Sequence, residues 1–241
     1  MISVVIPVYN RRSTIIRSVN SVLAQTIQDI EIIIVDDCST DDTFSILQTI
    51  NDERVHYFRL EKNSGSCAAR NYGINIAKGD FIAFQDSDDE WFPDKLQKQL
   101  NLLVKAKADV ASCKLHRYTD LSASKYKIYP SYILLESDDV FSKILYENCI
   151  GTQTLLCKKQ CFKKIRFDET LKRFQDWDIA LQLSKEFRIV FCDEILLNSY
   201  IQINSISNKK NELYHAWLAL YRKYKREIET NNITHAKYLS R

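Results

Sequence analysis

Short, solid runs of apolar residues alternate along the first half of the chain with segments in which apolar residues recur every three or four positions. The solid runs predict strands buried on both faces, at residues 3–8, 30–35, 55–60, 81–85 and 110–115. The periodic segments predict helices that begin at Ser13 and at Ser39 and helices at residues 68–77 and 93–104. This alternation is typical of an α/β fold with a mostly parallel sheet covered by helices on both faces.

The pattern is less regular from residue 116 onward. We expect residues 117–136, which are polar and contain several tyrosines, to form either an excursion over the site or an irregular connection. Helices are expected at residues 137–146 and 176–187, and short strands at 154–157 and 189–192. Apolar residues between Leu213 and Ile228 mark one face of a long C-terminal helix.

Polar residues stand where three of the predicted strands end. Tyr9 follows the first strand, Asp36 and Asp37 follow the second, and the sequence Asp86-Ser87-Asp88-Asp89 follows the fourth. The carboxyl ends of parallel strands meet at one edge of a sheet, where such sheets bind their ligands. Three carboxylates within four residues repel one another unless a cation or hydrogen-bond donors share the charge. An exposed acidic turn is the alternative, but the convergence of three polar segments favours a site for Mn²⁺ or Mg²⁺, which prefer carboxylate oxygens.

The composition narrows the class of protein. The chain has 241 residues, of which 45% are hydrophobic and 27% charged, as in ordinary globular proteins. No apolar run approaches the ~18 residues of a membrane span, and no signal peptide is recognisable. Seven cysteines without a framework suggest reduced thiols and a cytoplasmic location. With four glycines only, the chain lacks the glycine-rich phosphate loops.

The charge is unevenly distributed. Residues 201–241 carry eight Lys and Arg against three Glu, a net +5, which leaves −2 of the overall +3 for residues 1–200. Basic residues beside an amphipathic helix suit an anionic membrane surface. The alternative is that the apolar face of this helix packs on the domain, with the basic side chains in solvent. We expect no nucleic-acid partner.

Five segments in order resemble family-two glycosyltransferases, which have the GT-A fold and include bacterial surface-polysaccharide enzymes. The resemblance covers roughly residues 2–207 and includes a last, weaker match at Ser205-Ile206-Ser207. The main segments are Val4–Asn10, Val35–Thr43, Ala69–Gly73, Asp86–Asp89 before Trp91 and Pro93, and Phe174–Asp178.

The resemblance implies a role for each matching residue. Asp37 would accept a hydrogen bond from the nucleotide base, with Pro7 and Tyr9 beside it, although Asp-Asp-x-Ser before a helix is also good capping chemistry. The planar donor fork of Arg70 would lie near the diphosphate, unless Arg70 is an ordinary surface arginine. Asp88 would bind the metal ion and Asp86 would lie nearer the ribose or a metal-bound water. Asp89 and Glu90 are expected to cap the next segment.

Asp176 matches the general base of the family, which takes the proton from the acceptor hydroxyl. Asp178 is two residues further along, and we expect it to point elsewhere if the segment is helical. The family commonly has an acidic residue where this chain has Gln175, and often a histidine where it has Gln202. Trp91 and Trp177 would either stack on the acceptor sugar or pack in the core.

The sequence therefore predicts an inverting, metal-dependent glycosyltransferase. We expect a GT-A domain at 1–207, with a nucleotide-sugar half at 1–115 and an acceptor half at 116–207, and a basic helical tail at 208–241. The donor would be a nucleotide-diphosphate sugar, UDP-linked, and the acceptor a saccharide carried on a lipid. Two alternatives are a non-catalytic partner subunit that binds nucleotide sugar or glycan, and a metal-dependent phosphohydrolase.

Overall fold

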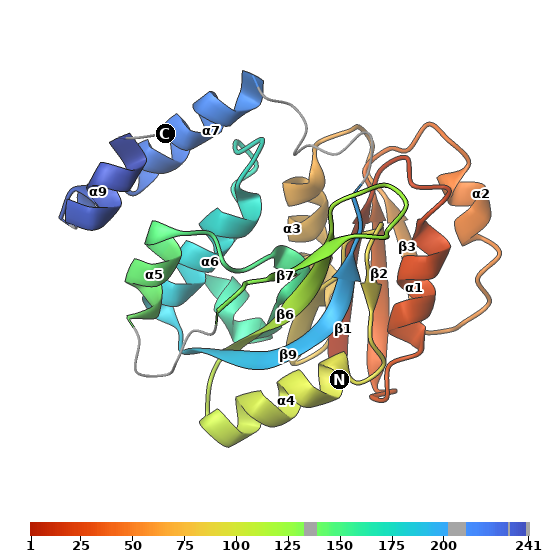
Figure 1. The fold of residues 1–241 in the computed structure, drawn as a ribbon. Helices are drawn as coiled ribbons and strands as arrows, with labels where there is room; N and C mark the ends of the chain where they lie inside the picture. The colour runs from red at the N-terminus through yellow and green to blue at the C-terminus, as the bar shows by residue number, and fades with distance from the viewer. Residues whose placement is uncertain (133–138, 202–210, 231, 240–241) are drawn as a thin grey trace.

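The computed structural model describes residues 1–132, 139–201, 211–230 and 232–239. A single nine-stranded sheet runs through it in the order β3-β2-β1-β4-β8-β6-β9-β5, with β7 paired to β6 (Figure 1). The strands are β1 (Ile2–Val8), β2 (Ile30–Asp36), β3 (Val55–Arg59), β4 (Phe81–Phe84), β5 (Glu90–Trp91), β6 (Val110–Tyr118), β7 (Tyr126–Tyr129), β8 (Leu156–Lys158) and β9 (Ile189–Ser199). The first four are mutually parallel, and β9 runs parallel to β6. The predicted α/β architecture is confirmed.

Helices cover both faces of the sheet (Figure 1). They are α1 (Ile15–Leu23), α2 (Thr43–Leu47), α3 (Ser66–Ile76), α4 (Lys95–Ala106), α5 (Val140–Tyr146), α6 (Gln175–Glu186), α7 (Asn211–Lys223), α8 (Lys225–Thr230) and α9 (Asn232–Leu239). Successive side chains of β1 point to opposite faces: Val4 and Ile6 enter the core that contains residues of α1 and α4, and Val5 enters the core of α3, α5 and α6. The first strand is apolar throughout because both of its faces are buried.

Several predicted elements need correction. Ser39 does not cap a helix, because its hydroxyl accepts a hydrogen bond from the Asn10 backbone, and the helix is the single short α2. The predicted excursion at 117–136 contains β7, which pairs with β6 in a hairpin. The last predicted strand extends to 11 residues in β9. The strands β8 and β9, from the predicted acceptor half, belong to the same sheet as β1 to β4, from the predicted nucleotide-sugar half.

The C-terminal helices pack on the domain. Leu220, Tyr224 and Ile228 are buried in the core that contains α5 and α6. Trp217 lies edge-to-face against Trp177, with 5.0 Å between ring centroids. Most of the apolar face of the tail therefore packs on the protein itself, as the alternative interpretation of this helix expects, while Leu213 at its start is 37% exposed. None of the helices in the described part of the chain is long and apolar enough to span a bilayer.

Two other expectations concern the cysteines and the last motif. All seven cysteines are free thiols, five of them buried, as expected of core filler. The segment Ser205-Ile206-Ser207 and Gln202 lie outside the described residues.

The tail is held to α6 by Asp178, a carboxylate with no exposed surface. It accepts hydrogen bonds from Tyr224 Oη at 2.8 Å and Gln182 Nε2 at 2.7 Å, and Lys223 Nζ lies 2.9 Å away. The buried negative charge of Asp178 is stabilised only while these three partners stay in contact with it.

We predict that Asp178→Ala lowers the free energy of unfolding by about 3 kcal/mol, because it leaves buried donors without an acceptor. Urea unfolding measures this change, and limited proteolysis should show earlier cleavage between α6 and α7. Glu229→Ala, which removes an exposed carboxylate of α8, is the control and should change stability by less than about 0.5 kcal/mol. Equal effects of the two substitutions would contradict this account of tail docking.

Lys95 lies in the core, and no acidic residue of the described part of the chain pairs with it. Its side chain is fully buried, with Nζ 2.8 Å from Gln99 Oε1 and 3.8 Å from the centroid of the Trp91 ring. Burial lowers the pKa of Lys95 from 10.5 to about 8, since the charged form loses its hydration.

This shift predicts a pH dependence of stability. Between pH 8 and 10 the unfolded chain holds a proton on Lys95 that the folded chain has released, so stability rises with pH. Measured by urea unfolding, this rise should be roughly 2 to 3 kcal/mol smaller in Lys95→Met than in the unmodified protein. The exposed Lys105→Met on the same helix should leave the rise unchanged. Identical pH profiles for Lys95→Met and the unmodified protein would refute the shift.

Candidate functional site

The polar residues predicted for a site gather at the carboxyl edge of the parallel strands. Pro7 lies within β1 and is buried, while Tyr9, just past its end, is 42% exposed. Asp37 follows β2, and Asp86 and Asp88 follow β4. A groove of about 490 Å³ lies at the other end of β4, lined by residues such as Asp80, Lys158 and Arg166, and contains none of these carboxylates. The chemistry of the strand ends, and not the groove, identifies the site.

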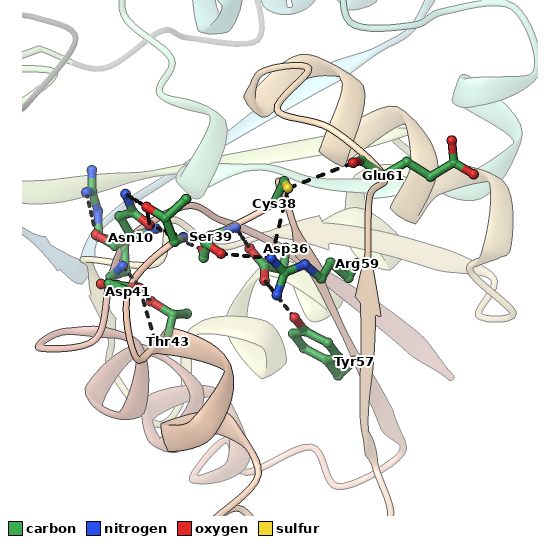
Figure 2. A network of polar contacts seen from close by, with 11 residues as sticks. Asn10, Asp36, Cys38, Ser39, Asp41, Thr43, Tyr57, Arg59 and Glu61 are labelled. Carbon is green, nitrogen blue, oxygen red and sulfur yellow. Dashed lines mark hydrogen bonds and ion pairs between the residues drawn. The ribbon is translucent and has the colours of Figure 1, made fainter.

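A polar network fixes the loops that follow β1 and β2 (Figure 2). Asp36, fully buried, accepts hydrogen bonds from Tyr57 Oη at 2.6 Å and from the Ser39 backbone at 2.8 Å. Asn10 meets Thr40 through both its side-chain oxygen and its side-chain nitrogen, at 2.8 Å and 3.2 Å. These contacts make Asp36 a structural residue and hold the loop that carries Asp37.

Asp37 is hydrogen-bonded to the loop that leads into α3. Its two carboxylate oxygens accept hydrogen bonds from the backbone N–H groups of Ser64, at 2.6 Å, and Gly65, at 2.8 Å. Gly65 has φ +93°, a conformation that glycine adopts without strain, and it directly precedes the first turn of α3. Burial raises the pKa of Asp37, and the two N–H donors oppose that rise. The helix-capping alternative is wrong, because the carboxylate of Asp37 accepts its hydrogen bonds from this loop and not from the helix that follows β2.

Arg70, on α3, links the acidic segment after β4 to the start of α6. Its Nη2 lies 2.8 Å from Asp86 Oδ1 and its Nη1 3.4 Å from Gln175 Oε1. Only 7% of the residue is exposed, so it is not an ordinary surface arginine. Gln175 also accepts a hydrogen bond from Ser66 Oγ at 2.8 Å. An amide at position 175 holds Arg70 without neutralising its charge.

The charge of the Asp88 carboxylate is only partly compensated by nearby arginines. Arg11 Nε lies 3.5 Å from its Oδ2, a long contact for an ion pair, while Arg17 donates to the backbone carbonyl of Asp88. Burial, and then the charge of Asp86, raise the pKa of Asp88.

Asp89 and Glu90 have a structural role. The Tyr200 backbone N–H donates to Asp89 Oδ1 at 3.1 Å, and the Tyr200 hydroxyl donates to Glu90 Oε2 at 2.7 Å. They thus fasten the chain just after β9 beside the acidic cluster and do not cap the next segment as expected.

The acidic cluster fits a divalent cation. Its donors are carboxylate oxygens, which Mn²⁺ and Mg²⁺ prefer, and the buried Oδ2 of Asp89 accepts no hydrogen bond from the described residues. The same residues contain no group of three or more His, Cys, Asp or Glu placed to hold a metal ion by themselves. An ion on Asp88 would therefore need ligands from the substrate and water, the usual arrangement where Mg²⁺ bridges to phosphate.

Asp176 lies in the first turn of α6, where the partial positive charge of the helix N-terminus favours a carboxylate. Its Oδ2 accepts a hydrogen bond from Asn148 Nδ2 at 2.8 Å. Burial raises the pKa of Asp176, while the Asn148 hydrogen bond and the charge of Arg117 oppose that rise. Asp178 points away toward the tail, as expected from its helical position.

The two tryptophans proposed as acceptor platforms lie in the core instead. Each is 2% exposed; Trp91 packs under Lys95, and Trp177 Nε1 donates to the Ile144 carbonyl at 2.6 Å. A ring without an exposed face cannot stack on a sugar, so the core alternative is correct.

Sequence reasoning missed three residues of the site. Arg11 and Arg17 come from the segment after β1, and Asn148 from the loop after α5. The two arginines had a signal in the sequence, since they stand near the start of a helix that leaves the carboxyl end of a strand. Asn148 had none, because nothing nearby in the sequence indicates its contact with Asp176, 28 positions away.

Comparisons with known proteins agree with this geometry. The family model described as glycosyl transferase family 2 matches residues 3–164. A protein of Bacillus subtilis named as a teichuronic acid biosynthesis glycosyltransferase, TuaG, is 36% identical over 215 residues, which are 87% of this chain and 82% of TuaG.

Two solved structures share the fold. S. aureus TarS 1–349 in complex with UDP-GlcNAc superposes with a TM-score of 0.72 at 22% identity, over 91% of this chain and 65% of that one. The mannosyltransferase PcManGT of Pyrobaculum calidifontis, in complex with GDP-Man and Mn²⁺, gives 0.68 at 17% identity, over 93% and 64%. The chain thus spans about two thirds of each solved chain, and these likenesses establish its architecture.

Proposed function

The chain belongs to glycosyl transferase family 2, and we propose that it moves a hexose or N-acetylhexosamine from a UDP-linked donor to a hydroxyl of a saccharide acceptor, with inversion at the anomeric carbon. Family membership makes the protein a glycosyltransferase and removes the phosphohydrolase alternative. The donor, the metal and the stereochemistry are parts of the proposal.

The observation that carries the proposal is the position of Arg70. Its guanidinium group touches both Asp86, which follows the donor-side strand β4, and Gln175, the neighbour of Asp176. A cation that anchors a diphosphate and a carboxylate that deprotonates the acceptor are thus brought to one edge of the sheet. Direct displacement requires this proximity, since the leaving group and the base act on opposite sides of one carbon.

On the donor side, we assign the nucleotide base to Asp37, Tyr9 and Pro7, and the diphosphate to Arg70. A divalent ion held by Asp88, with Asp86 nearby, would neutralise negative charge on the departing diphosphate. Bound Mn²⁺ in PcManGT and UDP-GlcNAc in TarS support this assignment by likeness of fold. Arg11 Nε lies 3.5 Å from Asp88 Oδ2. Once a divalent ion neutralises the charge of Asp88, Arg11 would be free to contact a phosphate oxygen.

On the acceptor side, Asp176 accepts the proton of the attacking hydroxyl. The hydroxyl oxygen forms its bond to the anomeric carbon while the bond from that carbon to the diphosphate oxygen breaks, and the nucleotide diphosphate leaves with the bonding electrons. One displacement inverts the configuration of the sugar. Because Asp178 is bound to the tail and Gln175 is neutral, Asp176 is the carboxylate that this part of α6 offers.

The biological setting is inferred from TuaG. Because TuaG is named for teichuronic acid biosynthesis, we infer a role in assembling a bacterial surface polysaccharide, with a lipid-linked saccharide as acceptor and the inner face of the membrane as the location. Membrane contact through the apolar face of the tail is not part of the proposal, since Leu220, Tyr224 and Ile228 of that face are buried in the protein.

The remaining alternative is a non-catalytic subunit that binds nucleotide sugar. The missing acidic residue at position 175 is its motivation. Hydrolysis of UDP-GlcNAc with Mn²⁺ separates the two, because a subunit that only binds the donor leaves it intact.

The first prediction concerns the metal ion. Chelation with EDTA should abolish turnover of the donor, added Mn²⁺ should restore it, and Asp88→Ala should lose turnover while keeping the circular dichroism spectrum of the fold. Asp94→Asn, which alters an exposed carboxylate paired with Lys98, should behave like the unmodified protein. Undiminished activity after complete removal of divalent ions would sink the metal assignment.

The second prediction concerns the base. Asp176→Asn keeps the size of the side chain but cannot accept a proton, so kcat should fall by at least ~100-fold. The dissociation constant of the donor, measured by calorimetry, should barely move. Glu186→Gln in the last turn of the same helix should leave both values unchanged. Near-native turnover of Asp176→Asn would move the role of base to another residue.

A further inference from the structure

The orientation of the Asp176 carboxylate depends on one amide. Asn148 Nδ2 donates to Asp176 Oδ2 at 2.8 Å, while Asn148 Oδ1 lies 3.4 Å from the backbone N–H of Ile150 as its acceptor. An amide has one donor end and one acceptor end, so the contact with Ile150 directs the donor end toward Asp176. A hydrogen bond to one carboxylate oxygen limits rotation of the group and so sets the direction of the other.

Asn148 is itself fixed by its surroundings. The next two residues, Cys149 and Ile150, are buried in the core of α5 and α6. The hydroxyl of Tyr129, at the end of β7, donates to the backbone carbonyl oxygen of Asn148. The guanidinium carbon of Arg117, on the paired strand β6, lies 4.0 Å from the centroid of the Tyr129 ring. Contacts therefore run from the β6–β7 hairpin through Tyr129 and Asn148 to Asp176.

We propose that Asn148 is the positioning residue of the general base, and that Tyr129 keeps Asn148 in place for that task. This inference rests on the proposed function, in which Asp176 takes the acceptor proton. It adds that a neutral hydrogen-bond donor orients the carboxylate of the base and stabilises its ionised form. An arginine or lysine in contact would instead neutralise the charge of the base. It also gives the β6–β7 hairpin, expected to be an irregular excursion, a mechanical part in the reaction.

Charged and titratable groups reach Asp176 from several elements. Arg117 on β6 favours the ionised carboxylate, and Asp86, after β4, disfavours it. Tyr129 on β7 is neutral at ordinary pH, since burial raises its pKa well above the usual value. The Asn148 hydrogen bond belongs with the groups that favour ionisation. Its removal should therefore raise the pKa of Asp176 and move the acid limb of the rate profile to higher pH.

The test measures the titration of Asp176 directly. Carboxyl ¹³C NMR of aspartate-labelled protein, with the Asp176 signal assigned by its loss in Asp176→Asn, gives the midpoint without any substrate. We expect the midpoint in Asn148→Ala to rise by about one pH unit. Tyr129→Phe, which keeps the ring under Arg117 but removes the hydroxyl, should give a smaller rise. Asn198→Ala removes a part-buried asparagine that contacts His116 at 3.2 Å, and it should leave the midpoint unchanged.

Kinetics of UDP-GlcNAc hydrolysis with Mn²⁺ supply a second readout. Asn148→Ala should lower kcat about tenfold on the acid side of the profile, recover toward high pH, and leave KM unchanged. If Asn148→Ala does not fold, Tyr129→Phe gives the decisive result. An unchanged midpoint in these variants, with loss of stability alone, would overturn the positioning role. That outcome differs from failure of the proposed function, in which Asp176→Asn itself remains active.

Discussion

The part-buried contact between Arg70 and Asp86 is the interaction on which the arrangement of the site depends. A carboxylate at the end of β4 and a guanidinium on α3 meet at 2.8 Å, and the same guanidinium reaches Gln175 at the start of α6. Arg70 contacts the carboxylate of Asp86 and Arg11 that of Asp88, while Arg17 donates to the backbone carbonyl of Asp88. A divalent ion and a diphosphate bring opposite charges of similar size, so both can enter without leaving a net charge buried.

The second requirement is a rigid first turn of α6. Trp177 is bound to α5 by its indole N–H, Asp178 is bound by Lys223 and Tyr224 of the tail, and Asp176 directly precedes these two anchored residues in the same turn. The C-terminal helices thus stabilise the segment that carries the base, although no residue of the tail contacts Asp176 among the described interactions. A base carried on a turn whose next two residues are anchored keeps its backbone position when substrates bind and leave.

The sequence predicted what depends on local pattern. Solid apolar runs located β1 to β4 because those strands are buried in the sheet, and polar residues at their ends pointed to Asp37, Asp86 and Asp88. Arg70 and Asp176, which lie on helices, were found only through the family resemblance. It could not place Trp91 and Trp177, since an aromatic residue has the same appearance in a core as in a sugar site. Nor could it find Asn148, whose role exists only through contacts between distant segments. The sequence pattern of the tail indicated an apolar face, but it did not indicate which surface that face packs against.

The central claim is that one displacement takes place at this edge, with leaving group and base on opposite sides of the anomeric carbon. Its most direct test is the anomeric form of the sugar released when UDP-α-GlcNAc is hydrolysed with Mn²⁺, followed by ¹H NMR before the sugar mutarotates. With water in place of the acceptor, the account predicts that the β anomer appears first. Release of the α anomer would contradict a single displacement with Asp176 as base.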